Sequence, residues 1–406
     1  MKISIKIYLM LFVAFFYPGI TTVFAQDSSI AQTVTTMKPG ETQFMVVGLA
    51  TLGWVNQTTS NTLGGVKTTT KNNSFGDADR YEFSPMFLWR HGDKLLLEFE
   101  PAFDGYGLGV NWADVSYYVA PGLIVRGGYL VLPFGTYTKR LAAGWINKLT
   151  SDPTGTDIAG TDFGIEVEGG FPLGNMKWSY DVSLTNGFVL NNDGSIGNVG
   201  IDAISAGNNG KTVCGRIALL PLSNSSLEIG VSGLYGSMAP QQGATFTNTS
   251  STDTKGPSTS MYAIDLNYVQ NINPMQINIK AQYNASMVNN LNYLNPVDST
   301  KTYSFTNTTT AAFGQISLRP ALSKNNILKN LELAFRYSNY VTPQNSTWGQ
   351  NYSEEDIALN YWLSWRTVLK VGYETIKSDG TSSVDITGPQ GSTSINRLII
   401  QFSTQF

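Results

Sequence analysis

Apolar and polar side chains alternate along most of this chain, in short segments with a period of two. In the segment MKWSYDVSL, for example, Trp178 and Tyr180 occupy one phase, whereas Ser179 and Asp181 occupy the other. This pattern is typical of β-strands with one face in an apolar environment and one in a polar environment. Because a Lys or Arg that faces the middle of a bilayer costs about 2–4 kcal/mol, the charges of membrane-spanning strands should keep to one phase. Apart from strand ends, they do so here.

The alternating segments predict sixteen strands, at residues 44–55, 80–90, 93–102, 110–119, 123–132, 161–171, 176–189, 211–220, 225–237, 259–270, 274–285, 308–319, 329–341, 354–365, 367–377 and 394–406. The connections between them alternate between short and long. Long connections rich in Asn, Thr, Ser and Gly fall at residues 56–79, 103–109, 133–160, 190–210, 238–258, 286–307, 342–353 and 378–393. An even number of strands with short turns on one side and longer loops on the other is the plan of a transmembrane barrel. We therefore predict an all-β fold, a closed antiparallel barrel over residues 44–406.

The first 25 residues predict secretion. Lys2 and Lys6 begin the segment, an apolar core follows, and Val23 and Ala25 provide small residues before a cleavage site at Gln26. We expect a signal peptide at 1–25 and a short N-terminal segment at 26–43. Removing the peptide leaves 24 basic and 29 acidic residues, and nothing in this balance suggests nucleic acid. Cys214 is the only cysteine, so the chain cannot form an internal disulfide.

Aromatic residues near the short connections support a membrane-spanning barrel. Seven of them share the apolar phase close to a short turn or to the C-terminus: Trp89, Tyr117, Phe171, Trp178, Tyr268, Trp365 and Phe406. Tyrosine and tryptophan gather at the two interfaces of a membrane, so this set predicts an aromatic girdle at the short-turn side.

The terminal strand RLIIQFSTQF, which ends on Phe406, resembles the C-terminal signature of Gram-negative outer-membrane proteins. The blocks EFSPMFLWRHGDKLLLEFEPAF and ADVSYYVAPGLIVRGGYLVLPFG resemble early strands of porins of the phosphate-selective type. The resemblance implies a sixteen-stranded channel in the outer membrane, often a homotrimer, with the third outside loop folded into the channel. It also implies that Phe406 is a signal for the outer-membrane assembly machinery, and that the N- and C-termini are periplasmic.

The charges in the inward phase are balanced, eleven against eleven. The acidic set is Glu82, Glu98, Glu100, Asp114, Glu166, Glu168, Asp181, Glu228, Asp265, Glu332 and Glu374. The basic set is Arg80, Arg90, Lys94, Arg126, Lys177, Arg216, Lys280, Arg319, Arg336, Lys370 and Arg397. From these we expect the pore wall to include Arg80, Glu82, Glu98, Glu100, Asp114, Arg126, Glu166, Glu168, Arg336, Lys370 and Arg397. No ladder of Arg and Lys runs along the inside, which departs from the phosphate-selective pattern and argues against phosphate specificity.

The third loop, residues 133–160, is the longest outside connection, and its apolar residues around Trp145 suggest that it packs against the inner wall. Lys139, Arg140 and Lys148 of this loop are the predicted pore constriction. If they outweighed the balanced wall, the pore would prefer anions mildly. The alternative interpretation of these three residues is an ordinary solvated charge run.

These observations favour a porin, a water-filled channel for passive diffusion of small hydrophilic solutes and ions, with outer-membrane lipid around it. An enzyme is disfavoured because His91, the only histidine, lies in a predicted tight turn, and a Ser nucleophile needs a His base. Catalytic, metal and cofactor sites are therefore not expected. The alternative from another class is a barrel that serves mainly as a surface interaction or adhesion protein through its long polar loops.

Overall fold

The computed structural model describes residues 40–75, 81–105, 107–156, 159–191, 197–201, 211–240, 257–289, 292–298, 300–382, 387 and 390–406. The predicted signal peptide at 1–25, most of the 26–43 segment and the pore-wall residue Arg80 lie outside these residues.

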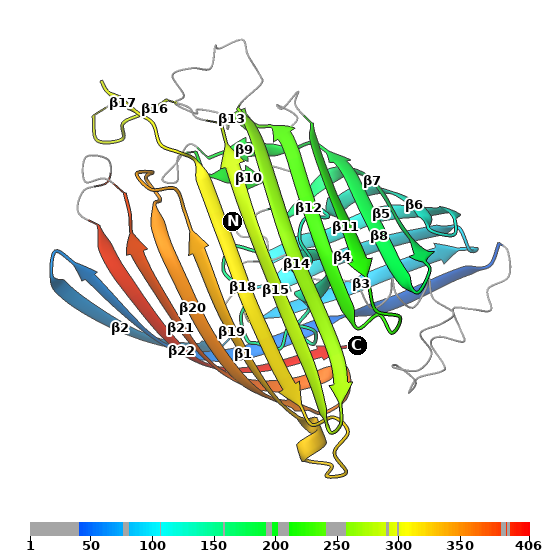
Figure 1. Ribbon diagram of the computed structural model, residues 1–406. Helices are drawn as coiled ribbons and strands as arrows, with labels where there is room; N and C mark the ends of the chain where they lie inside the picture. Colours follow the sequence, from blue (N-terminus) through cyan, green and yellow to red (C-terminus); the bar gives the residue numbers. More distant parts are fainter. Residues whose placement is uncertain are drawn as a thin grey trace.

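Sixteen long strands pair antiparallel with their neighbours and close into one barrel (Figure 1). They are β1 (Thr42–Leu63), β3 (Glu82–His91), β4 (Leu95–Asp104), β5 (Gly107–Ala120), β6 (Leu123–Val131), β7 (Thr161–Leu173), β8 (Met176–Thr185), β11 (Thr212–Leu220), β12 (Leu227–Ser237), β14 (Ser258–Ile272), β15 (Met275–Val288), β18 (Thr308–Arg319), β19 (Leu331–Val341), β20 (Gln350–Trp362), β21 (Thr367–Gly380) and β22 (Gly391–Gln405). The barrel closes where β1 pairs with β22, from Leu49 opposite Gln405 to Leu63 opposite Gly391. The prediction of a closed sixteen-stranded antiparallel barrel is confirmed.

Shorter elements lie in the connections between the sixteen strands. A small sheet joins β9 (Phe188–Leu190), β10 (Val199–Ile201) and β13 (Ala239–Pro240), and β16 (Tyr293–Leu294) pairs with β17 (Thr302–Tyr303). Among the described residues, a π-helical turn at Tyr137–Leu141 lies in the connection between β6 and β7, and a 3-10 turn at Leu328–Asn330 lies in the connection between β18 and β19. Within the described residues, neither helical turn has the length or apolar character to cross a membrane.

The predicted loop at 56–79 is wrong over most of its length. β1 continues to Leu63 and forms a hairpin with β2 (Val66–Phe75), from Trp54 opposite Phe75 to Leu63 opposite Val66. Gly64 and Gly65 make the turn with φ of 57° and 81°, the left-handed conformation that tight hairpin turns require. The sequence pattern missed these strands because both faces carry Thr, Asn and Lys, so no apolar phase marks them.

Alternate side chains along each strand face the exterior and the interior of the barrel. On β20, Ile357 and Leu359 are 47% and 50% exposed, whereas Glu354 and Asp356 are buried. Outward-facing apolar side chains of this kind recur around the barrel, so the wall has an apolar exterior and a charged interior. We call the end with the short connections the short-turn end, and the opposite end the long-loop end.

Phe406 closes the seam of the barrel at the short-turn end. Its N–H donates to the carbonyl oxygen of Gly48, and the N–H of Gly48 donates to the carbonyl oxygen of Phe406. The Phe406 ring faces outward and stacks on Phe83, with 5.5 Å between ring centroids. A Cβ atom on Gly48 would lie 2.6 Å from this ring, so the absence of a side chain there makes room for it.

Candidate pore and its third loop

The third loop, between β6 and β7, lies inside the barrel. Tyr137 is 2% exposed and Ala143 is fully buried, and the partners that cover them are inward-facing residues of strands from around the barrel. Within its described residues, 133–156 and 159–160, the loop binds the wall in three ways: by apolar packing, by hydrogen bonds to its carbonyl groups, and by ion pairs. The prediction that the loop packs against the inner wall is confirmed.

Apolar side chains of the loop fill gaps between inward-facing residues. Ala143 and Trp145 pack with Leu49 of β1, Trp362 of β20 and Val368 of β21. In a second cluster, Tyr137, Leu141 and Ala142 pack against Phe313 of β18, and in a third Leu149 packs against Ala334 and Ala358. These contacts place the middle of the loop against β18–β21 and β1, across the lumen from its own strands β6 and β7.

Four consecutive carbonyl groups of the loop accept hydrogen bonds from the wall. Lys280 of β15 donates to the carbonyl of Ile146 at 2.8 Å. Lys370 of β21 donates to the carbonyls of residues 147 and 149 at 2.8 and 2.9 Å, and Asn360 of β20 to that of residue 148 at 2.8 Å. Lys370 was predicted as a pore-wall charge. It lies on the inner wall and also anchors the loop, because its buried ammonium group donates to the loop backbone.

Arg336 of β19 anchors the following residues. Its guanidinium group is fully buried and donates to the carbonyl and the hydroxyl of Ser151 at 2.9 and 2.8 Å. It also pairs with Glu354 at 2.8 Å and with Asp356 at 2.5 Å. Glu354 in turn accepts hydrogen bonds from the backbone N–H and the hydroxyl of Thr154. Glu354 therefore holds both the arginine and the loop, and Asp356 holds the arginine.

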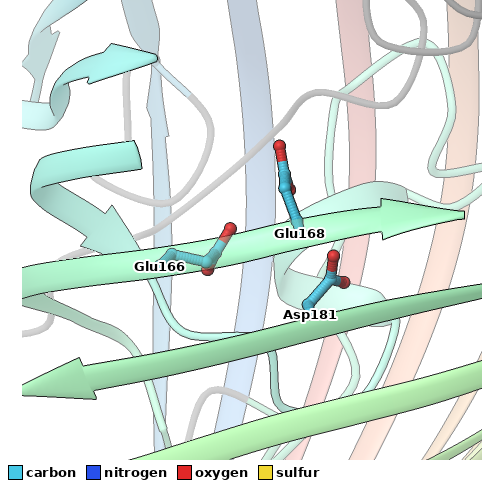
Figure 2. A group of neighbouring side chains, drawn as sticks. All are labelled: Glu166, Glu168 and Asp181. Atoms are coloured by element: carbon cyan, nitrogen blue, oxygen red, sulfur yellow. The ribbon is translucent and has the colours of Figure 1, made fainter. Parts of the chain in front are cut away.

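On the opposite wall, three carboxylates face the loop from neighbouring strands. Figure 2 shows Glu166 and Glu168 on β7 and Asp181 on β8, with the three side chains projecting from the strands. One carboxylate oxygen from each residue lies within 4.8 Å of the other two, close enough for a metal ion. The ammonium group of Lys139 already occupies this place, at 2.7 Å from Glu166, 3.4 Å from Glu168 and 4.0 Å from Asp181. The loop therefore supplies a counter-charge to this cluster.

The ion pairs of this wall join into one network. Arg140 of the loop bridges Asp181 at 3.3 Å and Glu228 at 3.0 Å, and Arg216 continues from Glu228 to Asp265. On the other side, Arg126 links Glu168 to Glu98 and Asp114. The network holds four basic groups, Arg126, Lys139, Arg140 and Arg216, and seven acidic groups, Glu98, Asp114, Glu166, Glu168, Asp181, Glu228 and Asp265.

This network removes the premise of the predicted anion preference. That prediction required Lys139 and Arg140 to outweigh a balanced wall. In the structure both are paired with carboxylates that outnumber them, and their side chains are only 9% and 14% exposed. The interpretation of these residues as a solvated charge run is also wrong, because they are buried in the lumen.

Lys148, the third predicted constriction residue, lies on a different wall. Its ammonium group is 3.7 Å from Glu332 of β19 and 4.3 Å from the ring centroid of Trp362. Arg319 lies over the same ring at 5.2 Å, and the indole N–H of Trp362 donates to Glu332 at 2.7 Å. The loop therefore presents Lys139 and Arg140 to one side of the lumen and Lys148 to the other.

The remaining predicted wall residues lie outside these contacts with the loop. Glu82 and Glu100 are buried and each accepts a hydrogen bond from Asn111 at 3.2 Å. Arg397 pairs with Glu374 at 3.2 Å and also donates to Gln57. These charges are lumen-facing, as their phase predicted.

Sequence reasoning missed two groups of interior residues. The first group is Glu354 and Asp356, which were left out of the predicted wall set. Ile357 and Leu359 in the outward phase of the predicted strand 354–365 would have placed both carboxylates inside. The second group is an apolar cluster inside the barrel near the long-loop end, in which Phe188, Leu190 and Tyr293 of the outer loops cover Cys214 and Met261. Its members are scattered over separate connections, so no local pattern indicated it.

Neither a family model nor a curated protein sequence matches the chain. Solved structures do match. The outer-membrane channel DcaP of Acinetobacter baumannii has a TM-score of 0.54 at 15% identity, covering 91% of this chain and 99% of that chain. An anion-selective porin from Comamonas acidovorans has a TM-score of 0.50 at 13% identity, covering 90% of this chain and 100% of that chain. At this identity the likeness shows a shared fold, that of the outer-membrane porins. The resemblance to phosphate-selective porins stays a prediction.

Proposed function

We propose that this chain, whose barrel has the fold of outer-membrane porins, is an outer-membrane channel through which small hydrophilic solutes and ions diffuse. The observation that carries the proposal is the third loop, which lies inside a charged lumen and is held there from several sides. A sixteen-stranded barrel encloses more space than its own wall side chains fill. A charged interior with a loop that narrows it suits a water-filled path.

The third loop is the constriction in this proposal, with Lys139 and Arg140 on one side and Lys148 on the other. Charge rings at the narrowest part of a pore control which ions pass. Because seven carboxylates share a network with four basic groups, we propose weak selectivity with a lean toward cations. We further propose that the short-turn end of the barrel faces the periplasm. The first residues of β1 and the last residues of β22 lie at this end. Assembly as a homotrimer stays a prediction.

Planar bilayer recordings test this proposal. We expect the purified protein to conduct, and the Lys139→Gln/Arg140→Gln variant to select cations more strongly, as a shift in reversal potential in a salt gradient. The physical reason is that the substitution removes two of the four basic groups and none of the acidic ones. The matched control is Lys67→Gln/Lys71→Gln, which removes two exposed lysines from the β1–β2 hairpin and should leave the reversal potential unchanged.

Two outcomes would contradict the proposal at different points. If the folded wild-type protein did not conduct, the channel function itself would be wrong. If it conducted and the loop variant had the same reversal potential as wild type, the channel would stand, but the constriction would lie elsewhere in the lumen.

A further inference from the structure

Two adjacent connections at the short-turn end expose large apolar side chains. In the turn at 320–330, Leu322, Ile327 and Leu328 are 52%, 64% and 47% exposed. In the neighbouring turn at 363–366, Leu363 and Trp365 are 60% and 45% exposed. The pairing of β19 with β20, with Leu331 opposite Tyr361, brings the two turns side by side. We call these two turns, 320–330 and 363–366, the basal patch.

The turn at 320–330 is held in shape although its apolar side chains are exposed. The side-chain oxygen of Asn325 accepts hydrogen bonds from the N–H groups of Ile327 and Leu328 at 2.9 and 3.2 Å. The N–H of Leu322 donates to the carbonyl of Pro274 in the next turn, and Arg319 donates to the carbonyl of Lys329 at 2.8 Å. Figure 1 shows this turn projecting at the foot of the barrel. Its exposed face is therefore preformed.

The charge of the basal patch has one sign. Lys324 and Lys329 lie in the first turn and Arg366 in the second, whereas neither turn contains Asp or Glu. The guanidinium group of Arg366 lies 4.0 Å from the ring centroid of Trp365. By contrast, the turn between β3 and β4 at the same end places Asp93 beside Lys94. A second copy of the patch would bring like charges together, so self-association through this face is disfavoured.

We propose that the basal patch binds anionic phospholipid in the leaflet at the short-turn end. The patch continues the lipid-facing exterior, because Leu318 and Leu333 at the adjoining strand ends are outward and 37% and 48% exposed. Aliphatic side chains and tryptophan enter the region between headgroups and acyl chains, and Lys and Arg bind the lipid phosphates. An anionic headgroup adds a net attraction that a zwitterionic one lacks. This inference is independent of whether the barrel conducts.

Quenching of Trp365 fluorescence by brominated lipid tests the proposal. The protein is reconstituted in phosphatidylcholine bilayers that contain equal mole fractions of either dibrominated phosphatidylglycerol or dibrominated phosphatidylcholine. The difference between wild type and Trp365→Phe isolates the Trp365 signal from those of the other tryptophans. We expect brominated phosphatidylglycerol to quench this signal at least about twofold more than brominated phosphatidylcholine. The excess should decrease as salt screens the attraction.

Two charge-matched variants locate the site. The first variant is Lys324→Gln/Lys329→Gln, and comparison with the same variant that also carries Trp365→Phe isolates its Trp365 signal. In this variant, the ratio of quenching by brominated phosphatidylglycerol to quenching by brominated phosphatidylcholine should fall to about one. In Lys67→Gln/Lys71→Gln, at the other end of the barrel, the ratio should stay at the wild-type value. Equal quenching by both lipids in wild type, or an unchanged ratio in Lys324→Gln/Lys329→Gln, would overturn the proposal. If the two lipids quenched equally, and the protein sedimented with purified peptidoglycan only when Lys324 and Lys329 were present, the patch would bind the cell wall instead.

Discussion

At the scale of single residues, the lumen of this barrel is built from buried charges that are held by ion pairs and by hydrogen bonds. Arg336 shows the principle most clearly, since it is fully buried and shares its guanidinium group between two carboxylates and the third loop. Removing one partner of a buried ion pair leaves the other without compensation, which costs more than replacing the whole group by neutral side chains.

The Arg336→Met variant should therefore be destabilised by about 3–5 kcal/mol, because Glu354 and Asp356 lose their counter-charge. The triple variant Arg336→Met/Glu354→Gln/Asp356→Asn should recover part of this loss. Reversible urea unfolding in lipid vesicles, followed by tryptophan fluorescence, measures both. A triple variant less stable than Arg336→Met would show that the carboxylates stabilise the fold independently of the arginine.

At the scale of elements, the third loop behaves as an additional layer of the barrel wall. Its backbone carbonyls at 146–149 are bound by side chains of three strands, so its position depends on residues far away in the sequence. The sequence predicted that this loop packs inward, because its apolar residues had no other surface to cover. It could not predict the anchors, since a lysine in the inward phase of a strand has the same signature whether it faces water or a carbonyl group.

The Lys370→Met variant should loosen the loop without changing the barrel, because it removes the donor to two loop carbonyls. We expect the same heat-modifiable band on gels as for wild type and larger current fluctuations in single-channel recordings. The control is Lys177→Met, an inward-phase lysine near the short-turn end whose ammonium group donates to Ser225. Equal current noise in wild type and Lys370→Met would show that this anchor does not restrain the loop.

At the scale of the whole molecule, alternation and connection length were enough to predict the strand number, the pairing and the inward phase of most strands. The phase of the first predicted strand, 44–55, could not be predicted, because both of its faces are apolar. These patterns failed where polar residues occupy both faces, as in the hairpin of β1 and β2, and where distant loops meet, as in the apolar cluster around Phe188. Both failures occur where the sequence shows no period of two. A period of two is visible only when the two faces differ, and contacts between separate connections leave no periodic trace.

Phe406 belongs to this scale because it closes the seam between the first and last strands. The Phe406→Ala variant keeps the backbone hydrogen bonds to Gly48 and removes the ring. If the ring is a signal for the assembly machinery, the folded band in outer-membrane fractions should fall, while refolding of the purified variant in detergent should match wild type. Equal losses in both measurements would show that the ring stabilises the seam and is not a recognition signal.

The central claim is that the third loop crosses the lumen and rests against the seam strands, and a designed disulfide tests it most directly. A Cβ atom on Gly144 would lie 3.2 Å from the Cβ atom of Ser403 on β22, slightly closer than the separation of about 3.5–4.5 Å in disulfides, so a small shift allows the bond. The variant carries Gly144→Cys and Ser403→Cys, with Cys214→Ala to remove the native thiol. Gly144→Cys/Ser179→Cys, which pairs the loop with β8 across the barrel, is the control.

We predict that the Gly144→Cys/Ser403→Cys pair oxidises to completion in the folded protein, with conductance close to that of the reduced form, and that the control pair stays reduced. Mass spectrometry of the linked peptides and bilayer recordings give the two readouts. The account would be contradicted if Cys at positions 144 and 403 stayed as free thiols and both reacted with a small hydrophilic maleimide in the folded barrel.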